Sequence, residues 1–95
     1  FGRLADAQLK ITAGADVIRR YRSSPPVERS FCSVCGSNLT FRFDPFPDAV
    51  WLAIGSLDDD PGARPSAHIF AGSIAPWHQI TDELPAFEKY PPQEE

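Results

Sequence analysis

Short runs of alternating hydrophobic and polar residues dominate the first half of the chain. Alternation of this kind is typical of β-strands that bury one face. It predicts strands over residues 8–12, 27–31 and 39–43. Residues 49–54 are hydrophobic throughout and predict a strand buried on both faces, and residues 68–70 predict a fifth short strand.

Proline and glycine separate these runs. Residues 44–48 cannot continue a strand, and the Asp-Asp-Asp-Pro-Gly sequence at 58–62 predicts a hairpin turn. Residues 15–21 fit one or two helical turns as well as a strand. The tail after Pro85 is expected to be extended or frayed. The pattern therefore predicts an all-β fold of small antiparallel sheets with a proline-rich C-terminal flank, in one domain over residues 1–95.

Composition and charge narrow the function classes. The chain has 95 residues, 42% of them hydrophobic and 23% charged, which suits one small globular domain. Thirteen acidic residues against nine basic ones give a net charge of −4, which disfavours binding to nucleic acid. The longest hydrophobic run has six residues, whereas a membrane helix needs roughly 20. We therefore expect neither a nucleic-acid partner nor a membrane.

The cysteine and methionine content is also informative. The chain contains no methionine and begins with Phe1, so we expect further residues to precede it in the translated protein. Its two cysteines are too few for a disulfide scaffold, and they cannot alone complete a four-ligand zinc site. Such cysteine usage suits a reducing compartment, so we expect a cytoplasmic location.

The two cysteines lie in the motif Phe-Cys-Ser-Val-Cys-Gly at residues 31–36. Two intervening residues allow both sulfurs to face one metal ion from a tight turn, and Gly36 can adopt the positive φ that such a turn requires. The motif predicts that Cys32 and Cys35 form half of a structural zinc site. A redox-active dithiol and a pair of reduced thiols with no special role are the alternatives. A redox dithiol usually precedes a helix, whereas the residues after Cys35 predict a turn and then a strand.

Other polar residues give weaker signals. His68 and His78 lack the short spacing of zinc-finger histidines, so we expect polar groups at a strand end and in a loop rather than ligands. A short basic cluster surrounds Tyr21 and has the chemistry to bind carboxylates. Solvated positions on a turn or edge strand are the favoured interpretation of this cluster, which consists of Arg19, Arg20 and Arg22.

Several segments follow the cysteine motif in a characteristic order. They are residues 50–58 (Val-Trp-Leu-Ala-Ile-Gly-Ser-Leu-Asp), 65–70 (Pro-Ser-Ala-His-Ile-Phe), 75–77 (Ala-Pro-Trp) and 82–87 (Asp-Glu-Leu-Pro-Ala-Phe). Together with Arg-Ser-Phe-Cys-Ser-Val-Cys-Gly-Ser at 29–37, this succession resembles the glutathione-dependent formaldehyde-activating enzyme family, also called the CENP-V/GFA domain. The resemblance extends from about Phe1 to Pro92.

The resemblance implies a β-rich, Mss4-like fold that holds Zn²⁺. In the family, a structural zinc is bound by four cysteines, and Cys32 and Cys35 match the later, Cys-x-x-Cys pair. A second, catalytic zinc is bound by three cysteines and faces the thiol substrate. Family members are carbon–sulfur lyases that join formaldehyde and glutathione into S-hydroxymethylglutathione. The resemblance therefore implies a small thiol such as glutathione as the partner.

The chain departs from the family in one respect. The early cysteine segments, Cys-x-Cys and Cys-x-Cys-x-x-Cys, are absent from residues 1–95, so no residue here is assigned to the catalytic zinc. The leading hypothesis is a CENP-V/GFA-type domain that lacks these segments and uses Cys32 and Cys35 as structural metal ligands. The rival hypothesis is a non-catalytic, zinc-stabilised β module that binds a partner or dimerises, with two copies sharing one zinc. Residues upstream of Phe1 would discriminate between the two.

Overall fold

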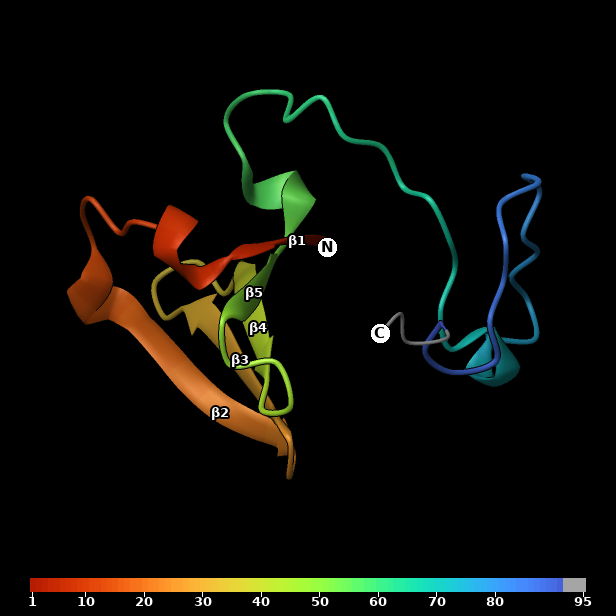
Figure 1. The fold of residues 1–95 in the computed structure, drawn as a ribbon, viewed down its shortest axis with the longest axis horizontal. Coiled ribbons are helices and arrows are strands. Elements are labelled where there is room, and N and C mark those ends of the chain that lie inside the picture. Colours follow the sequence, from red (N-terminus) through yellow and green to blue (C-terminus); the bar gives the residue numbers. More distant parts are fainter. Residues whose placement is uncertain (92–95) are drawn as a thin grey trace. The chain divides into compact units, whose positions relative to one another are not determined.

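A five-stranded antiparallel sheet forms the first part of the molecule (Figure 1). The computed structural model describes residues 1–91, which form two compact units, Phe1–Ala63 and a second unit that begins at Arg64. The part of the predicted frayed tail beyond Pro91 lies outside the described residues.

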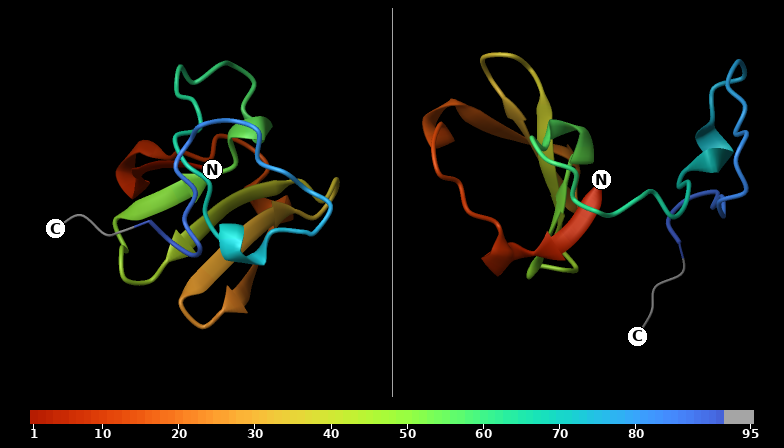
Figure 2. Two further views of the ribbon diagram at one scale, coloured as in Figure 1. Left: turned by 90° about the vertical axis from the view of Figure 1, so that its right-hand side faces the viewer. Right: turned by 90° about the horizontal axis from the view of Figure 1, so that it is seen from above.

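The sheet confirms the predicted all-β fold. Its spatial order is β1-β5-β4-β3-β2, and all neighbours run antiparallel. Figure 2 shows the twist of the sheet from two further directions. The strands are β1 (Gly2–Ala5), β2 (Ile18–Ser24), β3 (Val27–Cys32), β4 (Asn38–Phe43) and β5 (Ala49–Leu52).

Alternation along the strands gives the sheet two chemically different faces. On one face Phe41 of β4 stacks on Trp51 of β5, with ring centroids 5.0 Å apart, and the Arg29 guanidinium of β3 lies 5.3 Å from the Phe41 ring centre. The other face is mixed: Ser30 and Thr40, whose hydroxyls are 2.6 Å apart, lie beside aliphatic side chains such as Leu52. Aromatic stacking and cation–π contacts thus hold one face, whereas the other combines a hydrogen-bonded pair with aliphatic packing.

The buried core is small and lies in the sheet. Val50 is completely buried at the centre of β5, and Val27 and Ala49 are each 5% exposed. β5 is shorter than the predicted strand, and the prediction of burial on both faces holds only for Ala49 and Val50, since Trp51 and Leu52 are half-buried. The strand ends at Leu52, because the next backbone N–H, that of Ala53, bonds to the Leu39 carbonyl and the chain then turns.

The prediction of a strand over residues 8–12 is wrong. Gln8 ends a short 3₁₀ turn and its side chain accepts a hydrogen bond from the Ala5 N–H, so the turn is locked before any strand can start. The edge position beside β5 is taken instead by β1, which sequence reasoning did not find. Residues 15–21 combine both proposed structures: a 3₁₀ turn at Ala15–Val17 leads into β2 at Ile18.

The turn at residues 58–62 forms, but it does not join two paired strands, so the hairpin prediction is wrong. Gly62 has a φ of +78°, and its N–H donates to the Asp60 carboxylate at 2.8 Å. The residues that follow form no strand. The side chain of Asp60 therefore completes the turn locally, without a partner strand.

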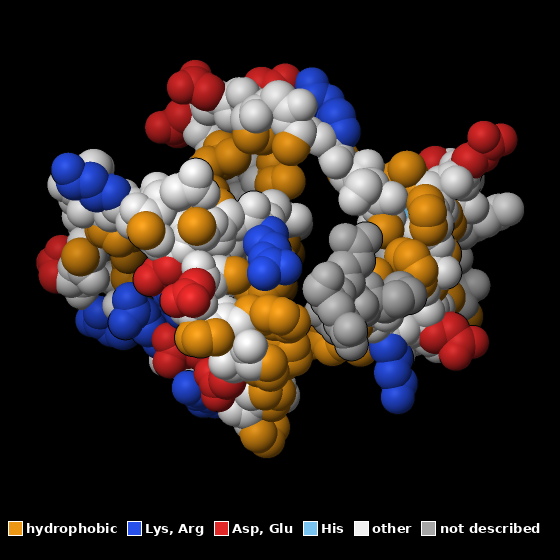
Figure 3. All heavy atoms as spheres, viewed as in Figure 1, with side chains coloured by type: hydrophobic (Ala, Val, Ile, Leu, Met, Phe, Trp, Pro, Cys, Tyr) orange, Lys and Arg blue, Asp and Glu red, His pale blue; other side chains and the backbone are white. Residues whose placement is uncertain are grey.

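The second unit consists mainly of loops. Residues 68–70 do not form the predicted strand. His68 makes an isolated parallel bridge to Ala86, and Phe70 adopts the left-handed conformation with a φ of 55°. A left-handed residue cannot continue a strand. Figure 3 shows hydrophobic side chains at the surface, and in this unit Trp77 is 88% exposed.

Candidate metal centre

The two cysteines lie on the turn that joins β3 to β4. Cys32 is the last residue of β3, and its backbone N–H donates to the Ser37 carbonyl at 2.9 Å. The Gly36 N–H donates to the Cys32 carbonyl at 2.7 Å, and Gly36 has a φ of +79°. Glycine adopts this backbone conformation without the steric cost that a side chain would add. The sequence thus specifies a tight turn with one cysteine at each side of Val34.

The turn is tied to β2 and to the 3₁₀ turn that precedes β2. Both the backbone N–H and the hydroxyl of Ser33 donate to the Val17 carbonyl, at 2.9 and 2.5 Å. Phe31, which precedes the turn, packs edge-on against Tyr21 of β2 with ring centroids 6.0 Å apart. These contacts hold the base of the turn, while its tip remains open: Val34 is 78% exposed.

Both thiols are free, with Cys32 half-buried and Cys35 exposed. Backbone N–H groups of Cys35 and Val34 donate to the Cys32 sulfur and lower the pKa of its thiol, and the Cys35 side chain adds to this effect. Partial burial opposes the shift. Because the hydrogen bonds favour the thiolate, they favour the form of cysteine that binds metal.

The pair fits half of a tetrahedral zinc site. Two free thiols three residues apart on one tight turn match the Cys-x-x-Cys half of a structural site, and N–H groups near the sulfur are the usual support for such ligands. Among residues 1–91, no three His, Cys, Asp or Glu side chains gather closely enough to hold a metal ion. The described residues therefore provide the two thiols of the pair and no third candidate ligand beside them.

The family model for the glutathione-dependent formaldehyde-activating enzyme matches residues 2–73. The chain belongs to this family. The match contains the cysteine turn and the whole sheet, and it ends before the last segments on which the resemblance was based. Comparison with curated proteins and with solved structures finds no significant match.

The histidines of this GFA chain have other contacts within their own unit. His68 Nε2 lies 2.9 Å from a carboxylate oxygen of Asp82, and this hydrogen bond lowers the pKa of Asp82. The backbone N–H of His78 donates to the Ala75 carbonyl at 3.0 Å. Neither residue forms a metal-binding group in the part of the chain that the structure describes, and their expected role as polar groups is consistent with these contacts.

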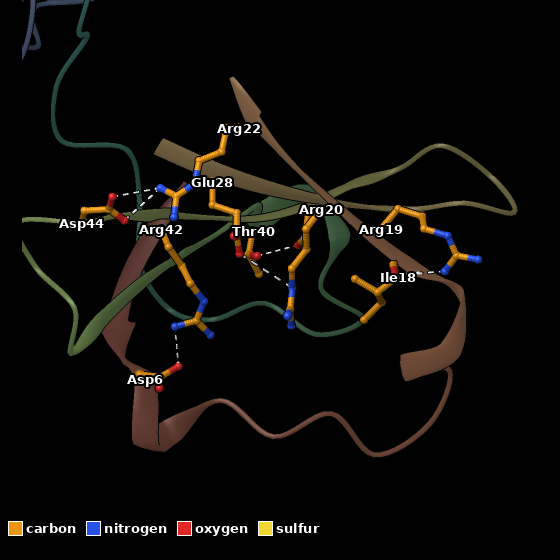
Figure 4. Close-up of polar contacts among 10 residues, drawn as sticks. Asp6, Ile18, Arg19, Arg20, Arg22, Glu28, Thr40, Arg42 and Asp44 are labelled. Atoms are coloured by element: carbon orange, nitrogen blue, oxygen red, sulfur yellow. Dashed lines mark hydrogen bonds and ion pairs between the residues drawn. The ribbon is translucent and has the colours of Figure 1, made fainter. Parts of the chain in front are cut away.

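The three arginines of the basic cluster do not act together (Figure 4). Arg22 pairs with Asp44 at 2.9 Å, and this hydrogen bond raises the pKa of the guanidinium. Arg19 donates to the Asp16 carbonyl at 2.8 Å. Since side chains alternate along β2, Arg19 lies on one face and Arg20 and Arg22 on the other. Alternation therefore divides the predicted cluster.

The sequence pattern did not reveal a set of polar residues on the sheet face that carries Arg20. The register places Ser30 opposite both Arg20 and Thr40, and Glu28 opposite Arg42. No local motif marks these residues, because they come from three separate strands. Polar residues alternate along β3 and β4, but this pattern indicates the group only when the register between the strands is known. Within residues 1–91 no helix has the length and hydrophobicity to span a membrane.

Proposed function

We propose that this GFA-family chain binds Zn²⁺ through Cys32 and Cys35, as half of a structural site. The observation that carries the proposal is the geometry of the turn: two free thiols three residues apart, on a turn that the Gly36 N–H closes onto the Cys32 carbonyl at 2.7 Å. A structural zinc contributes folding free energy when it is bound, because its ligands are gathered only in the folded state. The chain's own part is to present the two thiolates on a fixed turn; two further ligands complete the tetrahedron.

A cobalt titration of the whole reduced chain tests this proposal. Co²⁺ bound by thiolates gives charge-transfer absorption, so we expect these bands in the native chain and their loss in Cys32→Ser. Val34→Ala is the matched control, since it alters the same turn without removing a ligand. Zn²⁺ should raise the melting temperature of the native chain and of the control, but not that of Cys32→Ser. Native absorption in Cys32→Ser, or none in the native chain, would contradict the proposal.

The activity that we propose for the protein is that of its family: addition of the glutathione thiol to formaldehyde, as a carbon–sulfur lyase. Membership of the family supports this proposal. The described residues are assigned no catalytic role in it; Cys32 and Cys35 support the fold. A reduced thiol pair and a small-thiol substrate suit the cytoplasm. The test is the formation of S-hydroxymethylglutathione, followed by NMR, in the presence of zinc-loaded protein that carries the family's early cysteine segments. The rate should exceed that in buffer, and equal rates would contradict the lyase assignment.

A second candidate is a zinc-stabilised module without catalysis, in which two copies share one metal. The open tip of the turn favours it, because Cys35 is exposed and the neighbouring Val34 is 78% exposed. Two such turns supply four thiolates, which is a complete ligand set. Zinc content and molar mass distinguish the candidates: half a zinc per chain together with a doubled mass, reversed by a chelator, indicates the shared site. A zinc-loaded monomer excludes it.

A further inference from the structure

A small cavity lies between the loop that follows β1 and the face of the sheet that carries Ser30 and Thr40. Its volume is about 150 Å³. The aliphatic part of its wall comes from the loop and from three strands, and consists of Leu9, Ile11, Ile18, Leu39 and Leu52. Pockets for small molecules are typically apolar with a few placed polar groups, and this cavity has that composition.

Most polar groups of the cavity wall are already paired. The hydroxyls of Ser30 and Thr40 are 2.6 Å apart, and Ser30 is 8% exposed. Arg42 forms an ion pair with Asp6 at 2.6 Å, which links the sheet to the loop beneath it. The Arg42–Asp6 pair therefore neutralises this part of the wall, and the two hydroxyls are already partners of each other.

Arg20 and Glu28 are different. Arg20 Nε lies 3.9 Å from Glu28 Oε1, which is an ion-pair contact but too long for a hydrogen bond. Their side chains are 65% and 31% exposed. Figure 4 shows both side chains on the same side of the sheet, near Arg42 and Thr40, and all four residues line the cavity. The cavity thus has one cation and one anion at its wall, each with hydrogen-bonding capacity left for a ligand.

We propose that this cavity binds a small zwitterion, an α-amino acid with a branched aliphatic side chain. Its carboxylate would accept hydrogen bonds from the Arg20 guanidinium, and its ammonium group would donate to the Glu28 carboxylate. The aliphatic side chain would lie against the leucine and isoleucine wall. Each charge of the ligand then meets the opposite charge on the protein.

The balance of charge selects a zwitterion over a simple anion or cation. Arg42 is neutralised by Asp6, so Arg20 and Glu28 are the charges that decide the preference. A simple carboxylate would gain Arg20 but face Glu28, and a simple amine would gain Glu28 but face Arg20. Like charges at close range are unfavourable, so each half-charged ligand loses more than the one contact it lacks.

The size of the cavity fits the aliphatic part of such a ligand. A cavity of about 150 Å³ accommodates a group of a few carbon atoms, such as the four-carbon branched side chain of leucine. The charged head group then remains at the exposed Arg20 and Glu28, where it keeps part of its hydration.

This site is independent of the proposed zinc centre. Neither Cys32 nor Cys35 lines the cavity. Binding of an amino acid can therefore be present or absent whatever the cobalt titration gives, and a failure of one proposal does not imply a failure of the other.

Three matched probes test the ligand class on the full chain: L-leucine, 4-methylpentanoate and 3-methylbutylamine. They share the aliphatic part and differ in the charged groups. NMR titration should give saturable shifts for L-leucine at amides of the cavity wall, with at least about tenfold weaker binding of either half-charged probe. Equal binding of 4-methylpentanoate and L-leucine, or no saturable shift with any probe, would overturn the proposal.

Substitutions of the two charged residues test whether the ligand binds at this cavity. Arg20→Gln and Glu28→Gln should each weaken L-leucine binding at least about tenfold, and Glu28→Gln should also remove its advantage over 4-methylpentanoate. Arg19→Gln is the control, since Arg19 is the neighbouring arginine on the opposite face of β2. All three replaced side chains are on the sheet surface, and circular dichroism checks that each variant is folded. Native affinity in Arg20→Gln would overturn the proposal, as would an equal loss in Arg19→Gln.

Discussion

The two units of the chain differ in how their backbone groups are hydrogen-bonded and in how far their hydrophobic side chains are buried. In Phe1–Ala63, four antiparallel pairings join five strands, and Val27, Ala49 and Val50 are buried against them. In residues 64–91 the bridge between His68 and Ala86 is the one β contact, and no residue is fully buried. A continuous ladder lets a short chain bury side chains, whereas isolated contacts do not.

Proline content explains much of this difference. The described part of the second unit contains prolines at 65, 76, 85 and 91, and each removes a backbone donor. The structure of this unit depends on contacts between particular side chains. His68 forms a hydrogen bond with Asp82, and Phe70 packs edge-on against Tyr90 with ring centroids 4.7 Å apart. Stability should therefore depend on burial in the first unit and on local contacts in the second.

The largest effect is expected for Val50→Ala. Val50 is completely buried, so removing its two methyl groups should lower the free energy of unfolding by about 2 kcal/mol. Urea unfolding followed by Trp51 fluorescence in a Trp77→Phe background measures it. The control is Val34→Ala, at a 78% exposed position, which should change stability by less than about 0.5 kcal/mol. Equal losses in both variants would refute a core centred on β5.

An intermediate effect is expected at Phe70, where the left-handed backbone is costly for any residue except glycine. Phe70→Ala removes the contact with Tyr90 and keeps this cost; Phe70→Gly removes both. The glycine variant should therefore be the more stable of the two by about 1 kcal/mol. Hydrogen exchange at the Phe87 amide, which bonds to the His68 carbonyl at 2.8 Å, reports on this region. Slower exchange in the alanine variant would exclude backbone strain at Phe70.

The smallest effect is expected from the pH dependence of the second unit. The hydrogen bond from His68, with that from the Leu84 N–H, lowers the pKa of Asp82 in the folded state. The ionised carboxylate therefore stabilises the fold above the usual aspartate pKa of about 3.9, and this contribution is lost as the pH falls through the lower, folded pKa. The side chain is 49% exposed, so solvent weakens the effect.

NMR titration of the Asp82 carboxyl carbon measures this shift directly. Its midpoint should lie below about 3.9 in the native chain and rise towards that value in His68→Ala. An unchanged midpoint in His68→Ala would show that the histidine is not the main cause.

How much of the fold was predictable depended on whether the signal was local. Residues 27–31 and 39–43 alternate over a full strand length, and the structure places β3 and β4 there. Residues 8–12 alternate equally well but form no strand, because the edge beside β5 is occupied by β1. A pattern of period two shows that a segment can bury one face, but not which edge will accept it.

The candidate metal centre was the most predictable part of the site. Cys32, Cys35 and Gly36 lie within five residues, so one turn sets their geometry, and the local sequence is enough to predict that turn. The polar contacts on the sheet face that carries Ser30 and Thr40 could not be predicted in this way. Arg20 and Glu28 meet across β2 and β3, and the separation of Arg19 from Arg20 depended on the strand that residues 15–21 left undecided.

By itself the sequence determined the family, the β-rich character and the cysteine turn, because each is encoded in contiguous residues. The tertiary structure alone decided the strand order, the early end of β5 and the cavity beneath β2, β3 and β4. These features depend on register between distant segments. Backbone hydrogen bonds are the same for every residue type, so the pairing that forms is chosen by packing across the whole sheet.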